Sequence, residues 1–542
     1  MAHIYINNRL NYPKNIIVLL FLITTSQMAS QDILWEKSYG GLQSEYLFDV
    51  IPTPDYGFML AGSSLSDKSG NKIDERINDL DFWLWKMDEH GDLDWQQSYG
   101  GPGSDMLQSV VLTTDGGFIL GGTSTSSKGG IKEEDSRGQE DIWILKLNPV
   151  GDLQWQRTLG GTGRDELKQI IAVDGGGYLI GGSTDSPMLT NLDSPGEKRS
   201  ENYGNMDYWL IRLGADGNVE WEKTFGGVYR DELRSLIQTK DGGFLIGGIS
   251  NSPKSGTKEE DNFGHGDFWI IKLDENGNEQ WQRTIGGDKD DRLSVLIETT
   301  SGNYIAGGSS ASGTGGSKIR SNGKGTDFWI VALDEYGATI WQETYDFGSQ
   351  DILTSLVEND DGSLLVGGYA QSERTRLSKM DSRGINDYIA LKIDSNGNEL
   401  WRTTVGSNGT DILRRAIETH DGGYLLAGIS SGDISQDRNT GFGRFDFWVV
   451  KLKDNEKEEK MREEGLRAWP NPTMTYTNII VNYDFEQATV SVFDILGREI
   501  QRFETEQRTI PINLETYADG IYIIRVKTEI SEQSIKVIHG GK

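Results

Sequence analysis

The sequence predicts an all-β protein: a seven-bladed β-propeller closed by its N-terminal strand, followed by a small C-terminal antiparallel β-sandwich. Three observations support this prediction. A tryptophan recurs at nearly constant spacing, each repeat contains four short strand patterns separated by turn residues, and the repeat stops well before the C-terminus. The 542 residues include 69 glycines without a collagen-like period, which favours many tight turns.

The repeat is marked by a tryptophan that recurs every 60 residues, apart from one step of 66. These tryptophans are Trp35, Trp95, Trp155, Trp221, Trp281, Trp341 and Trp401. Ten positions after each lies an acid: Glu45, Asp105, Asp165, Asp231, Asp291, Asp351 and Asp411. A second series comprises Trp83, Trp143, Trp209, Trp269, Trp329 and Trp448. Because both series lie in apolar strand patterns, we expect the indoles to pack between neighbouring blades.

Each unit predicts four short strands. Residues 241–248 combine an Asp-Gly-Gly turn with an apolar strand, and residues 267–278 combine a strand with a Glu-Asn-Gly-Asn turn. Glycine and asparagine tolerate the positive φ angles that tight hairpin turns require. A longer polar stretch separates the two segments in every unit. Four-stranded units repeated around an axis are typical of a propeller.

The two ends of the array predict a closed ring. The first tryptophan strand, residues 33–38, lacks the three strands that precede it in other units, and the last unit ends at Leu452 without its tryptophan strand. Pairing these ends completes a seventh blade. An open solenoid, the structural alternative, needs capping units that the sequence does not contain.

The first thirty residues predict a signal peptide. Arg9 and Lys14 precede an apolar run, residues 16–23, that is too short to span a bilayer. We therefore place the propeller at residues 31–452, and expect no transmembrane segment. The chain has no cysteine, which excludes disulfides and thiolate metal sites. Its net charge of −30 argues against a nucleic-acid partner.

The repeat is replaced by a charged linker at 453–466 and a second β domain at 467–542. This domain contains Trp469-Pro-Asn-Pro472, Phe493-Asp-Ile-Leu-Gly-Arg498 and Gly520-Ile-Tyr-Ile-Ile-Arg-Val526. These motifs resemble the C-terminal sorting domain of type IX secretion substrates, although Trp469 stands where the family often has tyrosine. The residues that carry the motif are Pro470, Asn471, Pro472, Gly497, Gly520 and Tyr522. The resemblance implies the type IX machinery as partner, and export across both membranes of a Gram-negative bacterium to the surface or medium.

A ligand site is expected on the rim that carries the long loops. The acids from Glu45 to Asp411 form one candidate ring near the channel mouth, and two loops add acidic triplets. These triplets are Glu133, Glu134 and Asp135, and Glu259, Glu260 and Asp261. Carboxylates offer the hard oxygen ligands that Ca²⁺ prefers, although no complete calcium-loop pattern occurs. The alternative is structural, with each acid accepting backbone N–H bonds at a strand start.

The sequence assigns no catalytic residue and no other cofactor. The leading hypothesis is a monomeric surface or secreted module that binds a glycan or a protein. The alternative is a secreted hydrolase or a quinoprotein-like oxidoreductase that uses the same rim. The segment 273–281 resembles the tryptophan-docking repeat of quinoprotein dehydrogenases, but no motif matches the quinone or calcium ligands of those enzymes.

Overall fold

The computed structural model describes residues 31–189, 198–321, 325–371, 385–455, 457 and 465–540. The predicted signal peptide and most of the charged linker lie outside the described residues. The described residues form 35 β-strands and no helix. A search of this part of the chain accordingly finds no helix with the length and apolarity needed to cross a membrane. The prediction of an all-β protein is confirmed.

The N-terminal region is built from four-stranded antiparallel sheets, seven of them within the described residues. The first four sheets contain β2–β17 in chain order: β2 Glu45–Pro52, β3 Phe58–Ser64, β4 Asp81–Met87, β5 Leu93–Tyr99; β6 Asp105–Leu112, β7 Phe118–Ser124, β8 Asp141–Leu147, β9 Leu153–Leu159; β10 Asp165–Ala172, β11 Tyr178–Thr184, β12 Asp207–Leu213, β13 Val219–Phe225; β14 Asp231–Gln238, β15 Phe244–Ser250, β16 Asp267–Leu273, β17 Glu279–Ile285.

The remaining three sheets follow in order, and the last of them includes the first strand of the chain: β18 Asp291–Glu298, β19 Tyr304–Ser310, β20 Asp327–Leu333, β21 Thr339–Tyr345; β22 Gln350–Glu358, β23 Leu364–Gln371, β24 Asp387–Ile393, β25 Glu399–Val405; β26 Asp411–Glu418, β27 Tyr424–Ser430, β28 Asp446–Leu452, with β1 Ile33–Tyr39. We number the sheets one to seven in this order.

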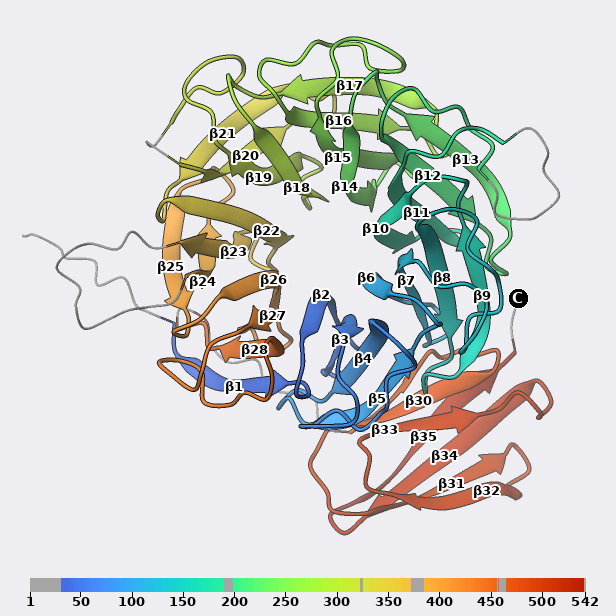
Figure 1. Ribbon diagram of the computed structural model, residues 1–542. Helices are drawn as coiled ribbons and strands as arrows, with labels where there is room; N and C mark the ends of the chain where they lie inside the picture. The colour runs from blue at the N-terminus through green and yellow to red at the C-terminus, as the bar shows by residue number, and fades with distance from the viewer. Residues whose placement is uncertain are drawn as a thin grey trace, which may run out of the picture.

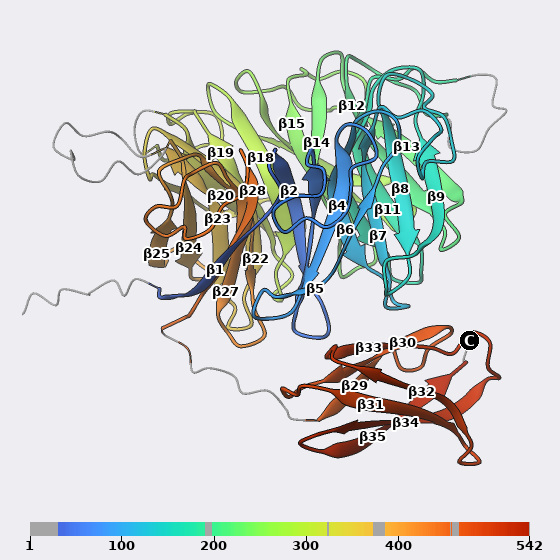
Figure 2. The ribbon, with the colours of Figure 1, turned by 60° about the horizontal axis from the view of Figure 1, so that its bottom comes forward.

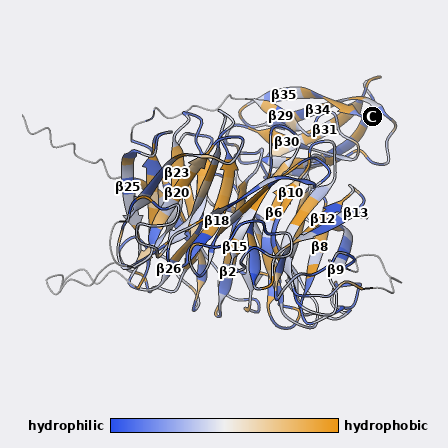
Figure 3. Ribbon diagram, turned by 90° about the horizontal axis from the view of Figure 1, so that it is seen from above, coloured by the Kyte–Doolittle hydropathy of each residue, from blue (hydrophilic) through white to orange (hydrophobic). Residues whose placement is uncertain are grey.

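The sheets are arranged radially around a central opening, as in a β-propeller (Figure 1). The first strand of each sheet, from β2 to β26, lies innermost, and the fourth strand lies at the periphery. Hydrophobic residues are concentrated in the strands (Figure 3). Each cluster of buried side chains draws on two neighbouring sheets, so the apolar core lies between the sheets.

The two tryptophan series both contact the neighbouring sheet, but they differ in burial. Trp269 is fully buried, and its Nε1 donates to Oε1 of Gln282 at 2.9 Å. Trp281 is half-buried beside Gly337 in the next sheet, and its Nε1 donates to the carbonyl oxygen of Glu335 at 3.0 Å. Within this outer series Trp401 is fully buried, whereas the other members are half-buried, less than the apolar strand pattern predicts.

The C-terminal domain packs two antiparallel sheets around its own apolar core, which includes Ile479, Val490 and Ile524. One sheet contains β29 Leu466–Trp469, β30 Tyr476–Val481 and β33 Thr509–Asn513; the other contains β31 Ala488–Asp494, β32 Glu499–Thr505, β34 Gly520–Thr528 and β35 Glu532–His539. This is the small antiparallel sandwich that alternation predicts.

The sandwich lies against the side of the ring that carries the tight turns (Figure 2). Thr509 donates its hydroxyl to Asp55 at 2.5 Å, and Nη1 of Arg508 lies 3.0 Å from Oε1 of Glu89. Asp55 and Glu89 belong to tight turns of the first sheet. The long-loop side of the ring is left clear of this domain (Figure 2).

Candidate functional site

The seven repeated acids are fully buried rather than exposed at a rim. Asp291 shows the typical contacts. Its Oδ2 accepts hydrogen bonds from the backbone N–H of Gly287 at 2.6 Å and from the hydroxyl of Ser312 at 2.9 Å, while Ser310 donates to its Oδ1. Burial raises the pKa of Asp291 above its usual value. This geometry is that of a structural network, and a ligand role for these acids stays a prediction.

The acidic triplets of the two loops repeat one another in structure. Asp135 accepts the backbone N–H of Lys128 at 2.8 Å, and Glu134 accepts that of Thr158 at 2.9 Å. Asp261 and Glu260 make the corresponding bonds in the second loop, to Lys254 and Thr284. The remaining members, Glu133 and Glu259, are exposed. Since two acids of each triplet shape the loop, cation binding by the triplets is not favoured by their contacts.

The sorting-motif residues also hold local structure. Asn471 joins the two sheets of the sandwich, donating to the carbonyl oxygen of Lys536 and accepting the N–H of Ile538, each at 2.9 Å. It lies between Pro470 and Pro472, both preceded by cis peptide bonds. Gly497 has a φ of 78° in the β31–β32 turn, and Gly520 begins β34. Tyr522 is buried, and its hydroxyl donates to the carbonyl oxygen of Ala518 at 2.6 Å.

The central channel contains a cavity of about 590 Å³ that the sequence analysis did not predict. Every innermost strand has a β-bulge between the second and fourth residues after its repeated acid, for example between Leu233 and Ser235 in β14. A bulge adds an unpaired residue and re-aims its side chain. The bulged residues all line the cavity: Phe48, Gln108, Lys168, Arg234, Ser294, Thr354 and Arg414.

The cavity lining is cationic although the chain is strongly acidic. Its charged side chains are Lys168, Arg234, Arg292, Arg414 and Arg415. The lining includes no aspartate, glutamate or histidine among the residues that the structure describes. Neighbouring acids compensate three of the cations at short distance: Glu166 lies 2.8 Å from Lys168, Glu232 lies 2.5 Å from Arg234, and Asp49 lies 2.8 Å from Arg415.

Arg414 differs from the other cations because no carboxylate compensates it within the described chain. Its guanidinium group lies over the ring of Phe48, 5.1 Å from the centroid. Its Nε is buried and has no hydrogen-bond partner among the described residues. Burial lowers the pKa of Arg414 from its usual value, which measures the cost of holding this charge away from water. An anion in the channel would meet both the charge and the free donor.

A signal for this site is present in the sequence. Leu233 and Leu236 are both buried although they lie three residues apart, an odd spacing that puts them on opposite faces of a regular strand. The same odd spacing recurs in the other units and indicates a bulge between the two apolar residues. The bulged position is also the one whose residue type changes most between units, from Phe48 to Arg414.

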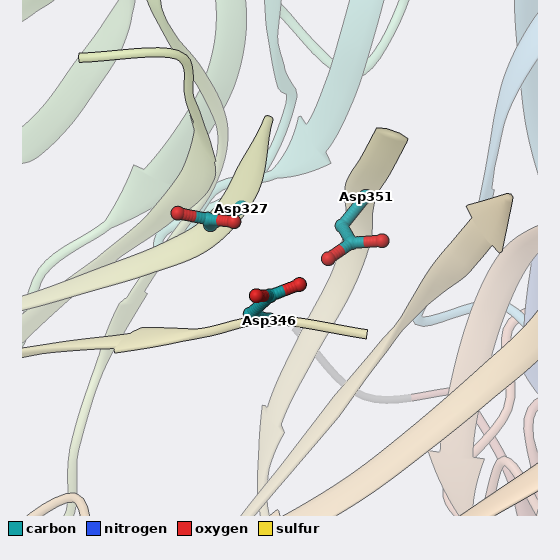
Figure 4. A group of neighbouring side chains, drawn as sticks. All are labelled: Asp327, Asp346 and Asp351. Carbon is teal, nitrogen blue, oxygen red and sulfur yellow. The ribbon is translucent and has the colours of Figure 1, made fainter. Parts of the chain in front are cut away.

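One group of carboxylates has the proximity that a metal site requires. Ligand oxygens of Asp327, Asp346 and Asp351 lie within 4.8 Å of one another, and Figure 4 shows the three side chains gathered at one point. Asp327 and Asp351 are buried, whereas Asp346 is exposed. Of these three, Asp351 belongs to the repeated acids expected from the sequence as candidate ligands. Burial raises the pKa of Asp351 to about 7, and the two neighbouring carboxylates add to the rise.

Comparison with known proteins confirms the resemblance of the C-terminal domain. Residues 467–539 match the family described as secretion system C-terminal sorting domain. This domain directs type IX secretion, so the chain is exported across the outer membrane to the cell surface or the medium. The family model does not extend over the propeller.

The relatives of the propeller are distant. Regulatory protein FlaEY of Caulobacter vibrioides is 24% identical over 475 residues, which cover 77% of this chain and 48% of that protein. The chain thus spans about half the length of this curated relative.

Similar solved structures include Sqt1 from Chaetomium thermophilum, with a TM-score of 0.38 and 11% identity over 82% of this chain and 97% of that one. Hydrazine synthase of Kuenenia stuttgartiensis has a TM-score of 0.42 and 9% identity over 80% and 99%. The apocarotenoid oxygenase of Synechocystis has a TM-score of 0.37 and 12% identity over 78% and 95%. None of these likenesses assigns an activity to this chain.

Proposed function

We propose that this exported protein is a binding module whose central channel holds an anionic group, a carboxylate or sulfate, of a surface glycan. The observation that carries the proposal is Arg414, a cation without a compensating carboxylate among the described residues that lines a cavity of about 590 Å³. Cavities of about 300–1,000 Å³ are the usual size for small-ligand sites. A charge-assisted hydrogen bond from Arg414 to an anion would satisfy its buried Nε.

The charge distribution supports an anion of limited size rather than an extended polyanion. The chain has a net charge of −30, so most of its surface repels anions. Five cationic residues line the channel, whose walls concentrate their field. Phe48 and Tyr369 also line the cavity and offer apolar faces to a sugar ring. A terminal acidic sugar fits this combination.

Binding is better supported than catalysis. The hydrolase and the quinoprotein-like oxidoreductase that the sequence left open both need an acid–base or cofactor site on the same ring. Hydrolysis of a glycosidic bond needs two carboxyl groups that flank the bond. The described residues that line the channel supply cations and no carboxylate.

Calorimetric titration of the purified chain tests this function. We expect uronate-containing or sulfated oligosaccharides to bind and neutral oligosaccharides of equal length not to bind. Arg414→Gln removes the charge at similar size and is expected to lower the affinity at least about tenfold. The matched control is Arg320→Gln, because Arg320 is exposed, pairs with Glu343 and lies outside the channel lining. Equal binding of neutral and anionic sugars, or full affinity in Arg414→Gln, contradicts the proposal.

We also propose that residues 31–452 form a seven-bladed ring closed by β1. Supporting this, β1 pairs antiparallel with β28, from Ile33 opposite Leu452 to Tyr39 opposite Phe447. Nε of Arg415 in the last sheet lies 2.8 Å from Oδ1 of Asp49 in the first. One apolar cluster contains Leu47 together with Phe447. Deletion of residues 31–39 exposes Trp448 and is expected to abolish cooperative unfolding of the ring; unchanged thermal unfolding of the truncated chain contradicts closure.

A further inference from the structure

The junction between the fifth and sixth sheets carries an acid where the other junctions carry glycine. Asp346 follows β21, and the corresponding residues after the other peripheral strands are Gly40, Gly100, Gly160, Gly226, Gly286 and Gly406. The glycine is needed because a Cβ at Gly286 would lie 2.0 Å from Oδ1 of Asp267, the acid that begins the third strand. At the fifth–sixth junction, by contrast, the corresponding acid, Asp327, faces a second carboxylate.

The same junction lacks a hydroxyl group that the other junctions possess. Nineteen residues after each of the other repeated acids lies a serine or threonine, and in four sheets its hydroxyl donates to the acid, as Thr184 does to Oδ1 of Asp165 at 2.5 Å. Ala370 occupies this position after Asp351. Asp351 is fully buried, and its Oδ1 has no hydrogen-bond partner among the described residues. Its other oxygen accepts the N–H of Phe347 at 2.7 Å.

The position that holds the compensating cation also differs in sequence. In the other sheets a buried lysine or arginine of the long loop attracts the repeated acid, as Lys132 attracts Asp105 and Arg438 attracts Asp411. The residue at the same spacing after Asp351 is Ser378, which lies outside the described residues. Lys318 attracts Asp327 and also donates to Ser310, and Arg402 attracts Asp346 and also pairs with Glu399.

These departures together concentrate negative charge at one point. Two carboxylates within about 5 Å repel each other strongly when they are partly desolvated. Here the sequence adds one carboxylate, Asp346, and places Ala370 where the other units have a hydroxyl beside the repeated acid. A cation bound among the three acids relieves the repulsion and supplies the partner that Oδ1 of Asp351 lacks.

We propose that Asp327, Asp346 and Asp351 bind a calcium ion at the fifth–sixth junction. Ca²⁺ lies about 2.3–2.6 Å from its oxygen ligands, so ligand oxygens within 4.8 Å of one another can share one ion. The three carboxylates point toward a common centre (Figure 4), and the exposure of Asp346 gives the ion a path from solvent. Water completes the six to eight ligands that Ca²⁺ takes, whereas Mg²⁺ demands a stricter octahedral geometry.

Titration of the chelator-treated full chain with CaCl₂ tests this site. We expect calcium to bind and to raise the melting temperature of the wild-type chain. Asp346→Gly restores the residue of the other junctions, so this variant is expected to fold and to bind calcium at least tenfold more weakly. The matched control is Asp433→Asn, which removes an exposed loop carboxylate away from the junction and leaves binding unchanged.

A second readout separates a binding site from a structural cluster. Without calcium, Asp346→Gly is expected to melt at a higher temperature than the wild-type chain, because it removes the repulsion between the carboxylates. With saturating calcium, the difference between the two melting temperatures becomes smaller or changes sign. Ala370→Ser, which restores the hydroxyl, is expected to weaken calcium binding. Failure of the wild-type chain to bind calcium at millimolar concentration, equal binding by Asp346→Gly, or an equal response to Mg²⁺ overturns the proposal.

Discussion

The repeated acid of each innermost strand and the bulged residue three positions after it differ in what surrounds them and in how they vary along the chain. The acid is present in every unit, is fully buried, and accepts the backbone N–H of a residue four positions earlier in nearly the same geometry, as in Asp105 and Asp165. The bulged residue faces the channel and ranges from Phe48 and Ser294 to Arg414. Repetition therefore marks the residues that maintain the ring, and variation marks those that meet the ligand.

The largest expected effect comes from removing one of the repeated acids. Asp291→Ala leaves the N–H of Gly287 and the hydroxyls of Ser310 and Ser312 without their acceptor. Each unsatisfied buried group costs about 1–3 kcal/mol, so we expect the free energy of unfolding to fall by about 3 kcal/mol or more. Chemical denaturation measures the loss.

The control for this change lies on β14, the innermost strand of the neighbouring sheet. Arg234→Ala removes an exposed channel residue, and surface changes of this kind usually alter stability by no more than about 0.5 kcal/mol. If Asp291→Ala is as stable as Arg234→Ala, the repeated acids do not hold the ring, and the contrast between the two positions fails.

The fold was predictable because the same local signals recur in each unit. The tryptophan spacing, the glycine turns and the apolar strands agree with one another, and the unmatched strand patterns at the two ends indicate how they pair. The positions of the repeated acids along the strands were also read correctly. Their burial has no local signal, because it depends on Ser310 and Ser312, which reach Asp291 from about twenty residues away in the sequence.

The channel was missed for a different reason. The sequence shows that Lys168, Arg234 and Arg414 occupy the same position in different units, but not that this position points to a common axis. That convergence follows from the ring and from the bulges, which break the alternation used to predict strand faces. The fifth–sixth junction was missed for a similar reason. The importance of Asp346 becomes clear only from the structure, where the corresponding glycines lie in contact with Asp81 or Asp267.

Adding a cation at a bulged position tests the same contrast by strengthening binding rather than by weakening the fold. Thr354 is a bulged, uncharged residue of the channel lining, so Thr354→Lys adds a cation to the site without removing a contact from the acid network. We expect the affinity for anionic oligosaccharides to rise by roughly three- to tenfold at low salt and by less at high salt, because screening weakens the added attraction.

Calorimetry at two salt concentrations measures this change. The comparison variant is Thr339→Lys, which adds the same charge at an exposed position on the peripheral strand β21. Equal gains in both variants mean that the anion responds to the overall charge of the chain and not to the bulged position.

The smallest expected effect is a dependence of stability on pH. Burial raises the pKa of Asp207 to about 7 from its ordinary value of 3.8, with Asp231 adding to the rise, and burial raises the pKa of Asp267 to about 6. An acid with a raised pKa binds more protons in the folded state, so the protein is most stable below pH 3.8 with respect to this group and loses that stability as the pH rises through about 7. Between pH 8 and pH 5 the full shift corresponds to about 2.6 kcal/mol; because relaxation and water penetration around the carboxylate reduce this, we expect a gain of about 1 kcal/mol from Asp207.

Acids with lowered pKa values do not cancel this trend. Burial acts to raise the pKa of Asp115, but the ammonium group of Lys146 outweighs it and lowers the pKa below 3.8. The stability that this pair supplies is present above pH 3.8 and is lost only on further acidification. Thermal unfolding from pH 8 to pH 5 therefore reports the buried acids, and Asp207→Asn is expected to flatten the curve. A wild-type melting temperature that falls over this range means that these carboxylates are ionised in the folded ring and that their burial is already compensated.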